Sequence, residues 1–149
     1  MAPSDEFEFF FEKEWSDGLP IIPPTEEKVS LLLSSIENSP DEIIGEFPPA
    51  YTSVSFYSVA VHAAMAGCKP EYMSLLLTSV RAILMEKFNL NGLQATLSPA
   101  APFLLVNGPY ASEIGLNGGL GCFGPGFRAN ATIGRAIRLM MMNLGSGIP

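Results

Sequence analysis

The densest run of glycine lies in the last third of the chain. Seven of the nineteen residues from Gly108 to Gly126 are glycine, which is half of the fourteen glycines in the sequence. Glycine is used where the backbone must take a positive φ or pass close to another group, and it weakens helices and strands. The run therefore predicts a tight loop. Apolar residues recur at helical spacing from Ala131 to about Asn143, so the loop is expected to lead into a C-terminal helix.

The remaining apolar pattern predicts an α+β fold, with a helical layer packed on a small sheet. Helical spacing of apolar residues occurs in three stretches before the loop, at about residues 26–36, 54–65 and 70–87, and Gly67 is predicted to end the second helix. Two short apolar runs, Leu93–Leu97 and Phe103–Val106, are candidate strands. Strands and helices are mixed without a regular alternation, which favours α+β over a parallel α/β sheet.

Length and composition bear on domain organisation. A chain of 149 residues is long enough for one hydrophobic core. We expect residues 1–24 to form an acidic, aromatic arm with a proline-rich lead-in, and residues 25–149 to form a single α+β domain. Only 15% of the residues are charged, whereas a typical soluble domain has about 25%. This shortage predicts a surface that is covered by a second copy, by a partner subunit or by a missing portion of a longer protein.

Charge is distributed unevenly along the chain. Residues 1–46 hold twelve acidic and two basic residues, and residues 47–149 hold three acidic and six basic residues, so their net charges are −10 and +3. Three arginines near the C-terminus are too small a positive face for nucleic acid, and a small anion is the more proportionate ligand. No apolar run reaches the roughly 18 residues of a membrane span, and the N-terminus is no secretory signal. We therefore expect no membrane association and a cytoplasmic location.

The glycine-rich loop and the helix after it are candidates for binding a small anion. The first N–H groups of a helix lack partners and carry partial positive charge, and glycine lets an anion approach them. The loop matches neither the P-loop nor the dinucleotide-binding fingerprint, so a purely structural loop is the alternative. Arg128 is the best charged candidate, while Arg135 and Arg138 could instead pair with the acidic N-terminal part. The candidate binding residues are Asn107, Gly124, Gly126, Arg128, Asn130, Thr132 and Arg135.

Three side chains are candidates for catalytic chemistry, and two of them, Cys68 and His62, have a structural alternative. Cys68 precedes Lys69, whose charge would lower the pKa of the thiol, but a buried and inert thiol is the alternative. Cys122 lies in the glycine-rich loop, where neighbouring N–H groups would favour a thiolate. His62 could act as a base, although a lone histidine among small apolar residues is more often a hydrogen-bonded core residue. One histidine and two cysteines without a metal-binding spacing predict no metal site, and the sequence identifies no cofactor.

Five motifs follow one another along the chain. They are Glu14–Pro20 (EWSDGLP), Met65–Tyr72 (MAGCKPEY), Gln94–Thr96 (QAT), Asn107–Pro109 (NGP) and Gly124–Ala136 (GPGFRANATIGRA). Together they resemble the domain that accompanies the UGSC domain in the UGSC family of selenoproteins and their cysteine homologues, over most of the chain from about Glu14 onward. The resemblance implies a thiol or redox setting. It carries over no catalytic residue, because the chain has no Cys-Gly-Ser-Cys run, and the reactive thiol or selenol would come from a partner. It also implies that the chain is a separate subunit or part of a longer protein.

These observations favour one functional hypothesis over two others. The first is a subunit of a multi-chain, thiol- or selenol-linked redox enzyme that binds a small anionic substrate at the loop, with Arg128 as the clamp. The second is a non-catalytic assembly module of a homo-oligomer or of a complex with a second protein subunit. The third is a redox protein that acts alone through Cys68 and Cys122. The substrate and the reaction do not follow from the sequence.

Overall fold

The computed structural model describes residues 6–98 and 100–147. The first five residues of the predicted arm, Pro99 and the last two residues of the predicted domain therefore lie outside the described residues. The elements, in chain order, are α1 (Glu6–Glu12), α2 (Glu26–Leu33), β1 (Ile43–Phe47), β2 (Thr52–Ser55), α3 (Phe56–Ala66), the 3-10 helix η1 (Pro70–Tyr72), α4 (Met73–Ile83), the 3-10 helix η2 (Glu86–Phe88), α5 (Leu90–Gln94), α6 (Pro109–Glu113) and α7 (Arg128–Asn143). Helices accompany one small antiparallel sheet, which confirms the predicted α+β class, and the glycine-rich loop leads directly into α7.

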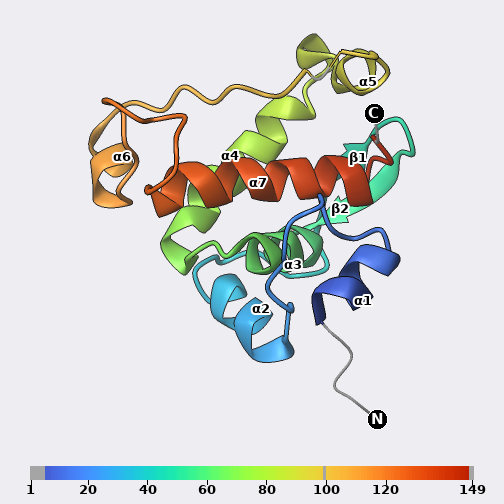
Figure 1. The fold of residues 1–149 in the computed structure, drawn as a ribbon, viewed down its shortest axis with the longest axis horizontal. Helices are drawn as coiled ribbons and strands as arrows, with labels where there is room; N and C mark the ends of the chain where they lie inside the picture. Colours follow the sequence, from blue (N-terminus) through green and yellow to red (C-terminus); the bar gives the residue numbers. More distant parts are fainter. Residues whose placement is uncertain (1–5, 99, 148–149) are drawn as a thin grey trace.

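The core is centred on α3 and α7. Figure 1 shows α7 running along the long axis of the molecule, with α3 and α4 packed beside it. Ala60 and Ala63 on α3 are fully buried, and their small side chains let α7 approach closely. From α7, Leu139 and Met140 are fully buried in the same core. Helix α2 covers another side of α3.

Both ends of α3 are set by local sequence. The side chains of Ser55 and Ser58 form a capping box, in which each hydroxyl accepts a hydrogen bond from the other residue's N–H. At the other end, Gly67 takes the left-handed conformation with φ of 83°, which glycine adopts without strain. The predicted end of this helix at Gly67 is confirmed.

The sheet is a hairpin of β1 and β2 that runs straight into α3. The strands are antiparallel, and their register shifts between Ile43 and Gly45. Phe47 and Val54 are fully buried and attach the hairpin to the core. At Gly45, an added Cβ would lie 2.9 Å from Cδ1 of Leu84, so the hairpin passes close to the end of α4 and the tip of that leucine side chain would have to shift to admit one.

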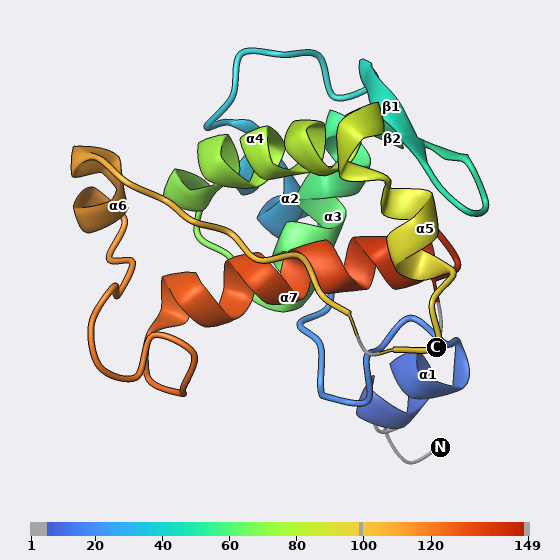
Figure 2. The same ribbon diagram turned by 90° about the horizontal axis from the view of Figure 1, so that it is seen from above.

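Both predicted strands are wrong. Leu93 and Gln94 belong to α5, and residues 103–106 are extended but pair with no strand in the described chain. Figure 2 shows this stretch passing over α7 between α5 and α6. A strand needs a neighbour to hydrogen-bond with, and period-two apolar character alone does not supply one. Two helix boundaries also differ from those predicted, since α4 ends at Ile83 and α7 begins three residues early, at Arg128.

The N-terminal arm is joined to the core by backbone and side-chain contacts. Phe10 is buried, and its ring packs beside Trp15. The Asn143 side-chain amide at the end of α7 donates to the Trp15 carbonyl over 3.1 Å. The Ile22 N–H donates to the Met65 carbonyl at 3.0 Å. The lead-in thus lies along α3 and α7, and the predicted boundary after residue 24 stays a prediction.

Candidate functional site

The first turn of α7 presents unpaired backbone donors. The N–H groups of Arg128, Ala129 and Asn130 donate to no acceptor in the described chain, and Phe127 at the N-cap supplies no side-chain bond. Before the helix, Gly126 has φ of +107°, a conformation that glycine tolerates best. The Arg128 side chain forms no ion pair with the described residues, and its Nε donates to the Gly67 carbonyl at 3.0 Å. The hydrogen bond to Gly67 directs Arg128 toward the end of α3.

Arg128 lines a pocket of about 240 Å³ that we call the cationic pocket. Three cationic side chains surround it: Lys28 from α2, Lys69 from the turn after α3, and Arg128 from α7. The pocket is completed by Ile22, Leu31, Leu32, Ala64, Gly67, Cys68 and Pro70. Lys69 pairs at 3.4 Å with Glu71, but an exposed pair of this kind is weak and leaves the charge available. The pocket therefore combines an apolar lining with positive charge.

Cys68 lies in the cationic pocket but is not an activated thiol. Its residue surface is 8% exposed, and Sγ donates to the Thr132 carbonyl at 3.4 Å. Burial raises the pKa of Cys68 to about 11, outweighing the opposite effects of the Thr132 hydrogen bond and the Arg128 charge. The predicted lowering of this pKa by Lys69 is wrong, because desolvation is the larger effect. The thiol stays protonated near neutral pH.

Arg135, a predicted ligand-binding residue, is occupied within the chain. Its Nε and Nη2 bind the two Asp17 carboxylate oxygens at 3.0 and 2.8 Å, and Nη2 also donates to the carbonyls of Leu19 and Pro20. Burial alone would raise the pKa of Asp17, but the hydrogen bond and charge of Arg135 lower it below its ordinary value. The alternative, in which Arg135 pairs with the acidic N-terminal part, is confirmed.

Asn130 holds the glycine-rich loop against α7. Its Oδ1 accepts the Asn117 N–H at 2.9 Å, and its Nδ2 donates to the carbonyls of Asn117 and Cys122 at 3.0 and 3.1 Å. Inside the loop, the Gly124 N–H donates to the Gly121 carbonyl at 2.8 Å. The side chain of Asn130 and the backbone N–H of Gly124 therefore have a structural role in holding the loop. Sequence reasoning did not anticipate this role.

The other predicted residues are spread around the site. The Thr132 hydroxyl donates to the Arg128 carbonyl at 2.8 Å, within α7. Asn107 is exposed in the turn before α6 and does not line the cationic pocket. Cys122 is partly exposed and, like Cys68, is a free cysteine. The structure therefore brings Arg128 and Cys68 together and leaves Asn107 and Cys122 out of the pocket lining.

His62 is a core residue. It is 5% exposed, its Nδ1 lies 2.7 Å from the Ser58 carbonyl, and its Nε2 lies 3.4 Å from Nδ2 of Asn143. Burial lowers the pKa of His62, while the hydrogen bond to Ser58 acts in the opposite direction. These contacts fit a neutral ring that donates through Nδ1 and accepts through Nε2. The interpretation of His62 as a hydrogen-bonded core residue is confirmed.

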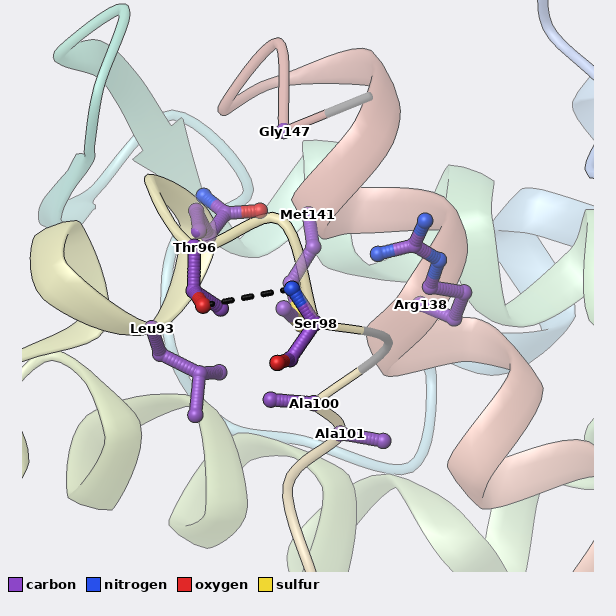
Figure 3. Close-up of a pocket in the computed structure, with 9 residues that line it drawn as sticks. Leu93, Thr96, Ser98, Ala100, Ala101, Arg138, Met141 and Gly147 are labelled. Carbon is purple, nitrogen blue, oxygen red and sulfur yellow. Dashed lines mark hydrogen bonds between the residues drawn. The ribbon is translucent and has the colours of Figure 1, made fainter. Parts of the chain in front are cut away.

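A second pocket, of about 180 Å³, lies beside Arg138 of α7. Figure 3 shows Arg138 next to the chain that follows α5, where the Ser98 N–H donates to the Thr96 hydroxyl over 3.2 Å. Within the described chain, Arg138 has no hydrogen bond or ion pair. This pocket holds one cationic side chain, whereas the cationic pocket holds three.

Lys28 and Lys69 were not predicted as binding residues. Lys28 lies one hundred positions before Arg128 in the sequence, so no local spacing relates the two. They meet only because α2 and α7 both pack on α3. The signal that could have found Lys69 is its place beside Gly67, since a helix end marked by glycine exposes the residues that follow it.

The chain matches no protein-family model, no curated protein and no solved structure. Over residues 6–98 and 100–147, no helix has the length and apolar character needed to cross a bilayer. In the same ranges, no three His, Cys, Asp or Glu residues are grouped so that they could hold a metal ion. The chemistry of the site therefore has to be inferred from its own geometry.

Proposed function

We propose that this chain is a subunit of a multi-chain enzyme with thiol or selenol redox chemistry, and that it binds a small anionic ligand in the cationic pocket. The observation that carries the proposal is the meeting of Lys28, Lys69 and Arg128 around one apolar-lined pocket, with Arg128 at the first residue of α7. Cations around a low-dielectric cleft concentrate anions there. The helix start adds partial positive charge of the same sign.

The pocket favours a carboxylate with an apolar body. Leu31, Leu32 and Pro70 offer apolar contact, and an arginine can bind both oxygens of one carboxylate. A volume of about 240 Å³ is below the roughly 300 Å³ at which drug-sized ligand sites begin. The ligand we propose is therefore a small monocarboxylate, and the glycine-rich loop supports the site through α7 without lining it.

The redox part of the proposal rests on the resemblance to the UGSC family. In that reading, the reactive thiol or selenol belongs to a partner subunit. The raised pKa of Cys68 supports this, because a thiol with a pKa of about 11 is a poor nucleophile at neutral pH. Two free cysteines are common in a reducing compartment, and we propose a cytoplasmic location on that ground.

The alternative function is a non-catalytic assembly module. The large exposed apolar side chains that favour it include Leu105, Leu120 and Phe123, each more than 80% exposed. Exposed apolar patches on soluble proteins often mark interaction sites.

Ligand-induced thermal stabilisation tests the anion site. We expect short-chain and aromatic monocarboxylates to raise the Tm of the full chain, and their uncharged amides to leave it unchanged. A ligand at a hundred times its Kd adds about 2.7 kcal/mol, which corresponds to a rise of roughly 5–10 °C for a chain of this size. Arg128→Gln should remove most of this rise because it deletes the central cation.

Arg138→Gln is the matched control. It removes a charge from the same helix but from outside the cationic pocket, so it should keep the full stabilisation. Equal stabilisation of the Arg128→Gln and unmodified proteins, with both folded by circular dichroism, would contradict the proposed site. The same conclusion would follow if no monocarboxylate shifted the Tm.

A further inference from the structure

Forty residues of this chain are almost without charge. Between Lys87 and Arg128, only Glu113 carries a charged side chain. We call residues 88–127 the neutral segment. The rest of the chain accounts for most of the net charge of −7, so the surface made by the neutral segment differs in character from the remainder.

Within the neutral segment, residues 101–107 behave as a β-strand without a sheet. Half-buried and exposed residues alternate along them, which is the period of a strand lying on a core. The half-buried residues are Pro102, Leu104 and Val106, and the exposed residues are Ala101, Phe103, Leu105 and Asn107. Leu104 and Val106 line a pocket together with Leu75 of α4 and Ile133 of α7.

The backbone of residues 101–107 has no hydrogen-bond partner within the described chain. The described sheet consists of β1 and β2 alone, and Figure 2 shows no strand beside this stretch. An extended segment with unpaired N–H and C=O groups is a template for pairing with another chain. Folded proteins usually cover or interrupt such an edge, and here it is neither charged nor bulged.

The exposed side chains form an apolar patch beside this edge. Phe103 and Leu105 are 67% and 82% exposed, and Phe123 from the glycine-rich loop is 86% exposed. The rings of Phe103 and Phe123 contact each other with centroids 5.8 Å apart. The patch thus joins the extended stretch to the loop.

We propose that residues 101–107 pair antiparallel with the same residues of a second copy of this chain, forming a two-fold symmetric dimer. Two copies that each carry a net charge of −7 repel one another, and the acidic residues 1–46, with a net charge of −10, are the main source of that repulsion. The neutral segment is where they can meet with little repulsion. An antiparallel pair about a two-fold axis is self-complementary, since the same patch serves on both sides. It places the Phe103 and Leu105 side chains of both copies on one face, where cross-strand apolar contacts add stability.

This inference rests on the oligomeric part of the proposed function and not on the cationic pocket. None of the residues that line the cationic pocket belongs to residues 101–107. Loss of carboxylate binding would leave the dimer intact, and loss of the dimer would leave the pocket intact. The two tests can therefore fail separately.

Sedimentation velocity of the full chain over a range of concentrations measures the dimer. We expect a monomer–dimer equilibrium with no larger species. Leu105→Asp should raise the dimer dissociation constant at least about a hundredfold, because it brings two carboxylates together in an apolar contact. Met85→Asp is the matched control, since Met85 is 59% exposed and lies outside the neutral segment. It should leave the dissociation constant unchanged.

Amide hydrogen exchange on the unmodified protein tests strand pairing without any substitution. Every second N–H group of residues 103–107 should exchange more slowly as the dimer forms, because pairing along one edge of a strand engages alternate N–H groups. A chain that remains monomeric, or that forms only open-ended aggregates, would overturn the proposal. So would a dimer that survives Leu105→Asp, or one in which these amides exchange as fast as in the monomer.

Discussion

The body around α3 and α7 and the neutral segment use the same apolar residue types in opposite ways. In the body, Phe56, Leu139 and Met140 are at most 1% exposed, and regular helices satisfy the backbone. In the neutral segment, Leu105 and Phe123 are more than 80% exposed, and residues 101–107 have no backbone partner within the described chain. The body is a completed core, whereas the neutral segment has the composition of a core without enough of the same chain to cover it.

The contacts that attach the N-terminal lead-in and the glycine-rich loop to α7 also differ in charge. Arg135 attaches the N-terminal lead-in to the body through the Asp17 carboxylate. The glycine-rich loop is instead held to α7 by the neutral amide of Asn130. Asn130 makes three hydrogen bonds to the loop without adding a charged group there. The neutral segment is thereby kept suitable for contact with another apolar surface.

The largest effect on stability should come from creating a cavity in the core between α3 and α7. Met140→Ala removes a fully buried side chain of α7 and should cost about 2–5 kcal/mol in the free energy of unfolding. Leu120→Ala, in the neutral segment, should change it by less than about 0.5 kcal/mol because Leu120 is 99% exposed. Urea unfolding followed by circular dichroism measures both. A cost at Leu120 as large as that at Met140 would mean that the neutral segment belongs to the core.

The pH dependence of stability should distinguish the buried Cys68 from the partly exposed Cys122. The pKa of Cys68 is raised from 9.0 to about 11 by burial, so above pH 9 the unfolded chain releases a proton that the folded chain retains. The folded state therefore loses stability as pH rises, by about 1.5 kcal/mol between pH 9 and pH 10.5. Cys68→Ala should remove this part of the pH dependence, and Cys122→Ala should keep it. Urea unfolding at the two pH values measures the difference, and identical slopes for all three proteins would exclude a buried Cys68 thiol.

The smallest effect should come from releasing the glycine-rich loop. Asn130→Ala deletes three hydrogen bonds between α7 and residues 117–122 and should cost about 1 kcal/mol, since the loop can exchange them for bonds to water. The Asn117 amide should then exchange at least about tenfold faster, as its acceptor is gone. Asn107→Ala, which removes no intramolecular hydrogen bond of the described chain, is the control. Unchanged protection of Asn117 would show that the loop holds its shape without Asn130.

The parts of the fold that sequence reasoning predicted are those with local causes. Helical spacing and Gly67 located α3 and its end, and the glycine run located the loop before α7. The hairpin of β1 and β2 was missed because its pairing depends on contacts between strands and not on either strand alone. Residues 103–106 were wrongly predicted to be a paired strand. Their sequence pattern is that of a strand, but the described chain supplies no strand to pair with them.

The candidate site was predictable only in part. Arg128 stands out in sequence because it follows a glycine-rich loop and begins a helix. Lys28 could not be found, because it reaches the same pocket only through the packing of α2 against α3. The reactivity of Cys68 was misjudged because sequence shows the adjacent Lys69 charge but not the burial that dominates the pKa. Tertiary packing decides both cases.

The Asp17–Arg135 pair has a consequence for how the chain reaches its native state during synthesis. The two residues stand 118 positions apart. When Asp17 leaves the ribosome, Arg135 has yet to be translated. The apolar face of α3 is also uncovered at that stage, because α7, which packs on it in the folded chain, has not been made. A nascent chain that lacks α7 therefore exposes its future interior to chaperones. Tertiary structure around Asp17 is completed only by residues that are translated more than a hundred positions later.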